Sequence, residues 1–123
     1  MTTAYLADMH IILWSWHERE ELPAKYLQIL ASDSLVYASI VSIWEISIKV
    51  GLGKLSVDNI TENLARTGFM LLPIEAKHAE AVRHLPHHQR GPFDRMPIAQ
   101  AMSEKLQILT TDRNFPLHGV TVA

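Results

Sequence analysis

Apolar residues fall into short uninterrupted runs and into longer segments with helical spacing. The short runs predict strands at 4–7, 35–38, 69–72, 107–110 and 119–122. The longer segments predict helices around 11–14, from 22–23 through 30, at 40–52, from 58 or 61 to 68, at 75–85 and at 94–105. Because strands alternate with helices, we expect βαβ units that form an α/β sandwich around a parallel sheet.

Composition narrows the class of protein. The chain has 123 residues, 48% of them hydrophobic and 20% charged, which predicts one compact domain over residues 1–123. The absence of cysteine excludes a disulfide scaffold, a thiolate zinc site and a cysteine nucleophile. No apolar run approaches the roughly 18 residues of a membrane span, and the N-terminus lacks the basic residues of a secretory signal. With a net charge of −2, any nucleic-acid contact must come from a local patch.

Two aspartates directly follow predicted strands. Asp8 follows the run 4–7, and Asp112 stands just past the strand that ends at Thr110. Since binding sites in open parallel sheets form at the carboxyl ends of strands, we expect both acids at one edge of the sheet. The alternative interpretation is that each acid only caps the helix or turn that follows it.

A third acid, Glu45, lies in a helix that is apolar on nearly every side. Ser42, Glu45 and Lys49 form its narrow polar stripe. A buried carboxylate is costly unless it faces a cleft or a partner charge, so Glu45 is a candidate site residue. The alternative is an ordinary surface ion pair between Glu45 and Lys49.

The fourth acid, Asp94, precedes a proline in a predicted helix. A proline is tolerated among the first helical residues, where backbone N–H groups have no partner, so Pro97 predicts a helix that begins near Phe93 or Asp94. Asp94 then lies at the start of that helix, where an acid also interacts favourably with the helix dipole. Four converging carboxylates would repel one another, and Mg²⁺ or Mn²⁺ would resolve that repulsion and support metal-assisted phosphodiester hydrolysis.

The sequence resembles the PIN-domain family, and within it the VapC-like toxins of bacterial toxin–antitoxin pairs, over essentially its whole length. The similarity is carried by the opening segment 6–14, by the central segment 42–49 with the glycines that follow it, and by the segments 92–101 and 109–112. The resemblance implies a three-layer α/β/α PIN fold with a central, mainly parallel sheet of four to five strands. It also implies a Mg²⁺- or Mn²⁺-dependent ribonuclease that leaves 5′-phosphate ends, a homodimer, an inhibitory VapB-like antitoxin, and a bacterial or archaeal cytoplasm.

Carried over position by position, the catalytic and metal-binding acids are Asp8, Glu45, Asp94 and Asp112, with Thr110 as a supporting hydroxyl. Two positions depart from the family pattern. Met9 stands where relatives usually have Thr or Asn, and a methionine cannot orient the neighbouring acid by hydrogen bonding. Pro97 replaces a usual leucine, which we expect to be tolerated if it lies in the first turn of its helix.

Basic and aromatic residues offer further candidates. Arg90, Arg95 and Arg113 lie near two of the acids and form a possible phosphate-contacting rim, although scattered surface arginines are an equal alternative. His84, His87 and His88 match no closed zinc site and predict a solvated loop. Trp14 and Trp44 are assigned to packing, whereas Trp16 is a candidate for exposure.

Three functions remain open from the sequence. The first is an endoribonuclease toxin in which a metal-activated water attacks an RNA phosphodiester. The second is a non-catalytic PIN-like module that binds RNA or protein, and Met9 is its main support. The third is a metal-dependent deoxyribonuclease or another phosphohydrolase that uses the same acids.

Overall fold

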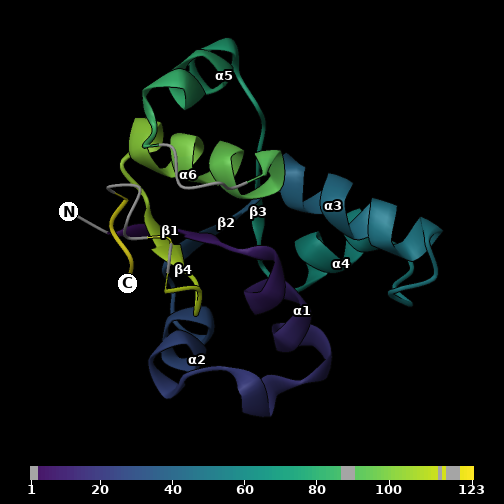
Figure 1. Ribbon diagram of the computed structural model, residues 1–123. Helices are drawn as coiled ribbons and strands as arrows, with labels where there is room; N and C mark the ends of the chain where they lie inside the picture. Colours follow the sequence, from purple (N-terminus) through teal and green to yellow (C-terminus); the bar gives the residue numbers. More distant parts are fainter. Residues whose placement is uncertain (1–2, 87–90, 114, 116–119) are drawn as a thin grey trace.

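Four parallel strands form the centre of the molecule in this computed structural model, which describes residues 3–86, 91–113, 115 and 120–123 (Figure 1). The strands are β1 (Ala4–Ala7), β2 (Leu35–Ser39), β3 (Met70–Leu72) and β4 (Gln107–Leu109), in the order β3-β2-β1-β4. Ala7 pairs with both Ala38 and Leu109, so the neighbouring strands end at the same edge of the sheet. The predicted α/β fold is confirmed.

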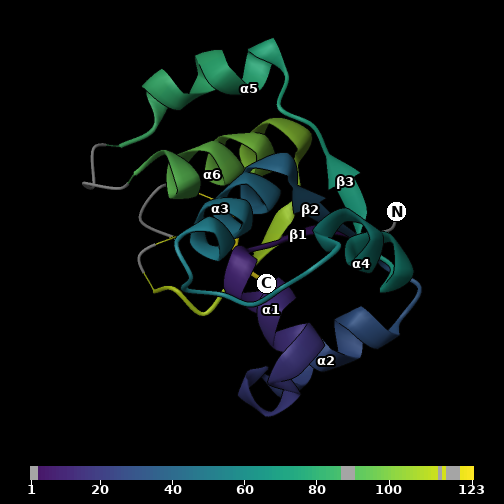
Figure 2. The same ribbon diagram turned by 90° about the vertical axis from the view of Figure 1, so that its right-hand side faces the viewer.

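Helices cover both faces of the sheet. The helices are α1 (Met9–His17), α2 (Ala24–Ala31), α3 (Ile40–Gly51), α4 (Ile60–Arg66), α5 (Ala76–Ala81) and α6 (Pro92–Glu104), with short 3₁₀ turns η1 (Arg19–Glu21) and η2 (Val82–His84). Helices α5 and α6 lie on one side of the sheet and α1 and α2 on the other, which gives three layers (Figures 1 and 2). None of the helices in the described residues is long and apolar enough to cross a membrane.

The two halves of the core follow from strand alternation. Successive strand residues point to opposite faces, so Leu6 and Ile108 pack with Ile98 of α6, whereas Ala7 and Leu109 belong to the core around α1 and α2. Both faces of β1 and β4 are therefore buried. This explains why these strands are continuous apolar runs in the sequence.

The sequence predicted a strand at 119–122, and this prediction is wrong for the residues that the structure describes. Val122 forms only an isolated parallel bridge with Ile108, and residue 119 lies outside the described part of the chain. Backbone bonds from Ile108 to Thr121 and from Ala123 to Ile108 hold this segment beside β4. A single bridge is enough to cover the edge of β4 without extending the sheet.

The position of Pro97 is also corrected. Helix α6 begins at Pro92, which suits the first helical position because its ring fixes a helical φ and its missing N–H is not needed there. Pro97 is therefore the sixth residue of the helix and lies beyond the first turn. It cannot donate the hydrogen bond that residue 97 of a regular helix gives to the carbonyl of Phe93.

Candidate active site

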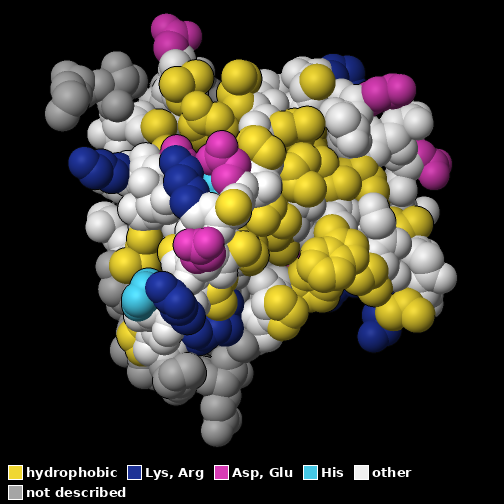
Figure 3. Space-filling view, turned by 90° about the horizontal axis from the view of Figure 1, so that it is seen from above, with side chains coloured by type: hydrophobic (Ala, Val, Ile, Leu, Met, Phe, Trp, Pro, Cys, Tyr) yellow, Lys and Arg dark blue, Asp and Glu magenta, His cyan; other side chains and the backbone are white. Residues whose placement is uncertain are grey.

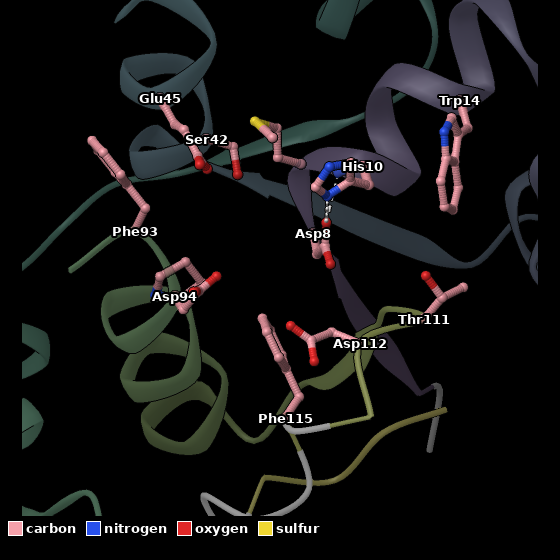
Figure 4. A pocket seen from close by; sticks show the side chains of 12 residues that line it. Asp8, His10, Trp14, Ser42, Glu45, Phe93, Asp94, Thr111, Asp112 and Phe115 are labelled. Carbon is pink, nitrogen blue, oxygen red and sulfur yellow. Dashed lines mark hydrogen bonds and ion pairs between the residues drawn. The ribbon is translucent and has the colours of Figure 1, made fainter. Parts of the chain in front are cut away.

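A cavity of about 450 Å³ opens at the carboxyl edge of the sheet, among α1, α3 and α6. Asp8, Glu45, Asp94 and Asp112, the four acids singled out by the sequence, all line it. The carboxylates of Asp94 and Asp112 point into the space that Asp8 and Glu45 also border (Figure 4). We call this cavity the acidic cleft.

Asp8 is fixed by two donors. It is the N-cap of α1, where its Oδ1 accepts the backbone N–H of His10 at 2.6 Å. Its Oδ2 accepts the hydroxyl proton of Thr110, also at 2.6 Å. The carboxylate is therefore oriented without help from residue 9, and the buried side chain of Met9 contributes apolar lining to the cleft.

Thr110 connects the two acids at the sheet edge. Besides donating to Asp8, its Oγ1 accepts the backbone N–H of Asp112 at 3.1 Å. Thr110 is in turn held by the buried Tyr26 of α2, whose hydroxyl accepts the N–H of Thr110 at 3.3 Å and lies 2.9 Å from its carbonyl oxygen. Tyr26 was not among the predicted site residues, since nothing local in the sequence shows that its hydroxyl reaches a residue 84 positions away.

A buried polar network anchors the start of α3, the helix that carries Glu45. Ser39 caps α3 by accepting the N–H of Val41 at 3.0 Å, and its hydroxyl donates to Oε1 of Gln100 at 2.5 Å. Gln100 is fully buried in α6, and its amide donates to the carbonyl of Pro73 at 3.1 Å. This network joins α3 to α6 and to the end of β3. Gln100 was not predicted from the sequence, although a polar glutamine among the apolar residues 98–101 indicates a buried hydrogen-bonding role.

The charge state of Glu45 reflects its neighbours. Burial raises the pKa of the Glu45 carboxyl above its ordinary value. The charge of Lys49 opposes this effect, the charge of Asp94 adds to it, His10 opposes it, and Asp8 adds to it. Two other cleft acids thus act electrostatically on Glu45, as expected where negative charges converge.

Asp94 enters the cleft from the first turn of α6. The preceding residue, Phe93, also lines the cleft and meets the ring of Trp44 edge-on, with ring centroids 4.8 Å apart. Trp44 is 53% exposed, so its assignment to packing holds for its edge-on contact with Phe93 and not for the apolar core. Trp14 is half-buried and borders the apolar core around α1.

The acidic cleft fits a hard divalent cation by the chemistry of its donors. Its four carboxylates are the oxygen ligands that Mg²⁺ and Mn²⁺ prefer. Among the described residues, however, the Asp, Glu and His side chains whose ligand atoms all lie within 4.8 Å of one another belong to another group, outside the cleft. The cleft acids are thus more widely spaced, which suits an ion that keeps several waters and binds one or two carboxylates directly.

The closer group consists of Glu75, His78 and Glu104 and lies between α5 and α6. We call it the α5–α6 cluster. Nδ1 of the fully buried His78 accepts the backbone N–H of Glu75 at 3.0 Å, so its ring proton is on Nε2, which donates to Glu104 at 2.8 Å. Lys77 Nζ lies 2.8 Å from the same Glu104 oxygen. The cluster is satisfied by its own hydrogen bonds and ion pair, and a metal on Nε2 would have to displace that proton.

Two arginines of the predicted basic rim, Arg95 and Arg113, lie in the described part of the chain. The Arg95 guanidinium donates to the carbonyls of Pro86 at 2.8 Å and of Val82 at 3.2 Å, so it holds α6 to the preceding segment. Arg113 is exposed beside Asp112. Arg90 lies outside the described residues, as do His87 and His88, whereas His84 is exposed.

Comparison with known proteins identifies related folds. Residues 5–119 match the sequence model of the PIN-domain family. No curated protein matches the sequence. Similar solved structures include VapBC2 of Rickettsia felis bound to a promoter DNA fragment, with a TM-score of 0.69 and 16% identity over 98% of this chain and 96% of the other.

Two further solved structures are similar. FitAcB of Neisseria gonorrhoeae has a TM-score of 0.65 and 21% identity over 96% of this chain and 95% of the other. A toxin–antitoxin complex of Klebsiella pneumoniae has a TM-score of 0.63 and 17% identity over 89% and 87%. At these low identities the similarity concerns the fold alone.

Proposed function

The chain belongs to the PIN-domain family, and from this premise we propose that it is a VapC-like toxin, a Mg²⁺- or Mn²⁺-dependent endoribonuclease. The observation that carries the proposal is the convergence of Asp8, Glu45, Asp94 and Asp112 on one cleft at the carboxyl edge of a parallel sheet. The position of this cleft, between strand ends and helix starts, is typical of α/β active sites. Membership of the family supports nuclease activity in general, and the metal ion and the RNA substrate are the parts that we propose.

The residues of the cleft divide the work of hydrolysis. When bound, a divalent cation would lower the pKa of a water molecule and neutralise charge on a phosphate oxygen. Asp8 and Asp112 would bind such an ion from the sheet edge, where Thr110 fixes the position of both. Glu45 and Asp94 would hold it from the opposite wall, directly or through water. Glu45, whose pKa is raised, is the candidate acceptor for the proton of the attacking water.

An antitoxin partner and a homodimer complete the proposal. The neighbours with the same fold are toxin–antitoxin assemblies, which supports a VapB-like protein inhibitor for this chain. Hydrophobic side chains form a broad patch on the face seen from above, beside the charged side chains of α5 (Figure 3). Several large apolar residues are exposed, among them Trp44 and Ile48 on one face of α3 and Leu52 directly after the helix. A surface of this kind favours protein partners.

The test is cleavage of total RNA and transfer RNA by the purified, partner-free chain with Mn²⁺, with Mg²⁺ and with a chelator. We expect metal-dependent cleavage that Asp94→Asn abolishes. Asp33→Asn is the matched control, because Asp33 is an exposed aspartate that does not line the cleft, and it should cleave like the wild type. A deoxyribonucleotide competitor separates a ribonuclease from a deoxyribonuclease.

Equal cleavage by Asp94→Asn and the wild type would place the activity in another site or in a contaminant. If folded wild-type protein bound RNA but cut none of the substrates, the non-catalytic module would be favoured. In that case Met9→Thr is the next variant. Because Asp8 already has two donors, we expect the wild-type chain to be active without this change.

A further inference from the structure

A second cavity, of about 380 Å³, adjoins the acidic cleft. It shares Met9, His10 and Trp14 with the cleft, so the two cavities adjoin along one face of α1. Its remaining walls are the later residues of that α1 face, Glu18 directly after α1, Lys49 of α3 and the segment 55–57. We call it the side pocket.

One face of α1 makes the floor of the side pocket. His10, Leu13, Trp14 and His17 all line it, and their spacing of three and four residues puts them on the same side of the helix. The rings of His10 and Trp14 lie 5.8 Å apart at 47°. Figure 4 shows Trp14 beyond His10, on the side away from Glu45 and Asp94. An aromatic surface therefore leads directly out of the acidic cleft.

The opposite wall adds apolar contacts and a positive charge. Leu55 and Val57 border the pocket, as does Lys49, which stands one helical turn after Glu45. Glu18, which is exposed just past the end of α1, is the acid of the lining. A cavity with aromatic and aliphatic walls and a cation of its own suits a planar, uncharged ring that carries an anion beside Lys49. Phosphate contacts by lysine together with stacking on aromatic side chains are how proteins hold single-stranded nucleic acids.

We propose that the side pocket binds the unpaired nucleobase next to the scissile phosphate of single-stranded RNA, with Trp14 as the stacking surface and Lys49 as a phosphate contact. The inference rests on the proposed nuclease function and specifies how its substrate is bound. The occupant is inferred from the position of the side pocket beside the acidic cleft. An RNA strand whose phosphate lies at the acids can place its neighbouring nucleotide over the His10–Trp14 surface. A base within a duplex is stacked and paired, so the pocket selects unpaired RNA.

The binding test follows the fluorescence of Trp14 in a chain that carries Trp16→Phe and Trp44→Phe, with chelator present to prevent cleavage. The probes are single-stranded hexamers of adenosine, cytidine and uridine, an abasic backbone of equal length, and a duplex. We expect quenching by the hexamers and at least tenfold weaker binding of the abasic strand and the duplex. The proposal is overturned if none of the hexamers quenches the fluorescence, or if the abasic strand binds as tightly as the hexamers.

The kinetic test separates stacking from packing. Trp14→Leu keeps an apolar side chain but removes the ring, so we expect KM to rise about tenfold with kcat within about twofold, whereas Trp14→Phe stays close to the wild type. Lys49→Gln should weaken binding and reduce the dependence of log affinity on log salt by about one unit. Lys54→Gln, an exposed lysine that does not line the side pocket, is the control and should change neither value.

The outcomes distinguish this inference from the proposed function. Metal-dependent cleavage with unchanged KM in Trp14→Leu would reject the side pocket and leave the nuclease intact. Quenching by hexamers in a chain that cleaves no RNA would reject the nuclease and keep the nucleobase site. If Trp14→Leu did not fold, the fluorescence titration and the Lys49→Gln pair would still decide.

Discussion

The acidic cleft and the α5–α6 cluster both gather carboxylates, yet their surroundings differ. In the α5–α6 cluster, Glu104 accepts hydrogen bonds from Lys77 and His78, and these two partners lower the pKa of its carboxyl. In the cleft, burial raises the pKa of Glu45, and the charges of Asp94 and Asp8 contribute to that rise. Proximity of acids alone therefore does not mark a cation site. The electrostatic environment separates the cleft, where neighbouring acids help to raise the pKa of Glu45, from a cluster in which Lys77 and His78 lower the pKa of Glu104.

The difference also separates function from stability. The four carboxylates of the cleft border one cavity, with Asp8 fixed by its capping bond and by Thr110, and their mutual repulsion is a cost that binding of a cation would offset. The α5–α6 cluster instead fastens a short helix to the longest helix of the described chain. Its groups contribute to folding and need no ligand. Substitutions in the two regions should consequently have opposite signatures.

The largest difference is expected in metal-dependent cleavage. Asp8→Asn removes a proposed ligand and should lower the rate at least about 100-fold, and it should weaken Mn²⁺ binding measured by calorimetry. Glu104→Gln should leave both quantities within about twofold of the wild type. A loss of Mn²⁺ binding in Glu104→Gln but not in Asp8→Asn would reverse the assignment of the two regions.

The second prediction concerns folding. His78→Ala removes a fully buried ring with two hydrogen bonds and should reduce the free energy of unfolding by about 2–3 kcal/mol. Cleavage per folded molecule should not change. His84→Ala, at an exposed histidine of the next turn, provides the control for denaturant unfolding. Loss of cleavage in well-folded His78→Ala would show that this region supports the site after all.

The third prediction tests how the cleft is positioned. Thr110→Val keeps the shape of the side chain but removes the hydroxyl that donates to Asp8 and accepts from Asp112, so cleavage should fall about 10- to 100-fold. Thr110→Ser should recover most of the activity. We expect the Mn²⁺ concentration for half-maximal rate to rise in the valine variant, whereas a purely structural role would leave it unchanged.

The smallest effect is a pair of stability changes with opposite sign, measured in metal-free protein. A carboxyl whose pKa is raised by folding contributes stability at pH values below its unfolded pKa, and this contribution is lost as the pH rises. At pH 7 the charged Glu45 is therefore unfavourable in the folded protein, and Glu45→Gln should stabilise the chain by about 0.5–1 kcal/mol. A carboxyl with a lowered pKa contributes stability above its unfolded pKa, so Glu104→Gln should destabilise the chain at pH 7, by less than about 1 kcal/mol.

Both differences should shrink when unfolding is followed down to pH 3, because each carboxyl is then increasingly protonated. Equal signs for the two variants at pH 7 would contradict the electrostatic distinction between the regions. Gln28→Glu on the exposed face of α2 controls for the general effect of one added charge.

The sequence predicted the parallel sheet and the four acids because both depend on local patterns. Apolar runs ending at Asp8 and Thr110 marked strand ends. The long-range supports were not predictable in this way. Tyr26 and Gln100 act on residues 84 and 61 positions away, and their hydrogen bonds exist only after the layers have packed.

Two failures have a similar physical origin. Pro97 was placed in a first turn because only its own preference was considered, whereas Pro92 competes for the first helical position and shifts the start of α6. Trp44 was assigned to packing because of its apolar neighbours. Its exposure depends on where α3 lies at the edge of the sheet, which helical spacing cannot specify.

The bond between Thr110 and Asp8 gives the chain a chronology, because its two residues are 102 positions apart. At a synthesis rate of about 5–20 residues per second, Asp8 leaves the ribosome on the order of 5–20 seconds before Thr110. Strand β1 lies between β2 and β4, so the early part of the sheet can form while the edge that carries Thr110 and Asp112 is still missing. A nascent chain therefore carries an incomplete acidic cleft until its last strand has been synthesised and has docked beside β1.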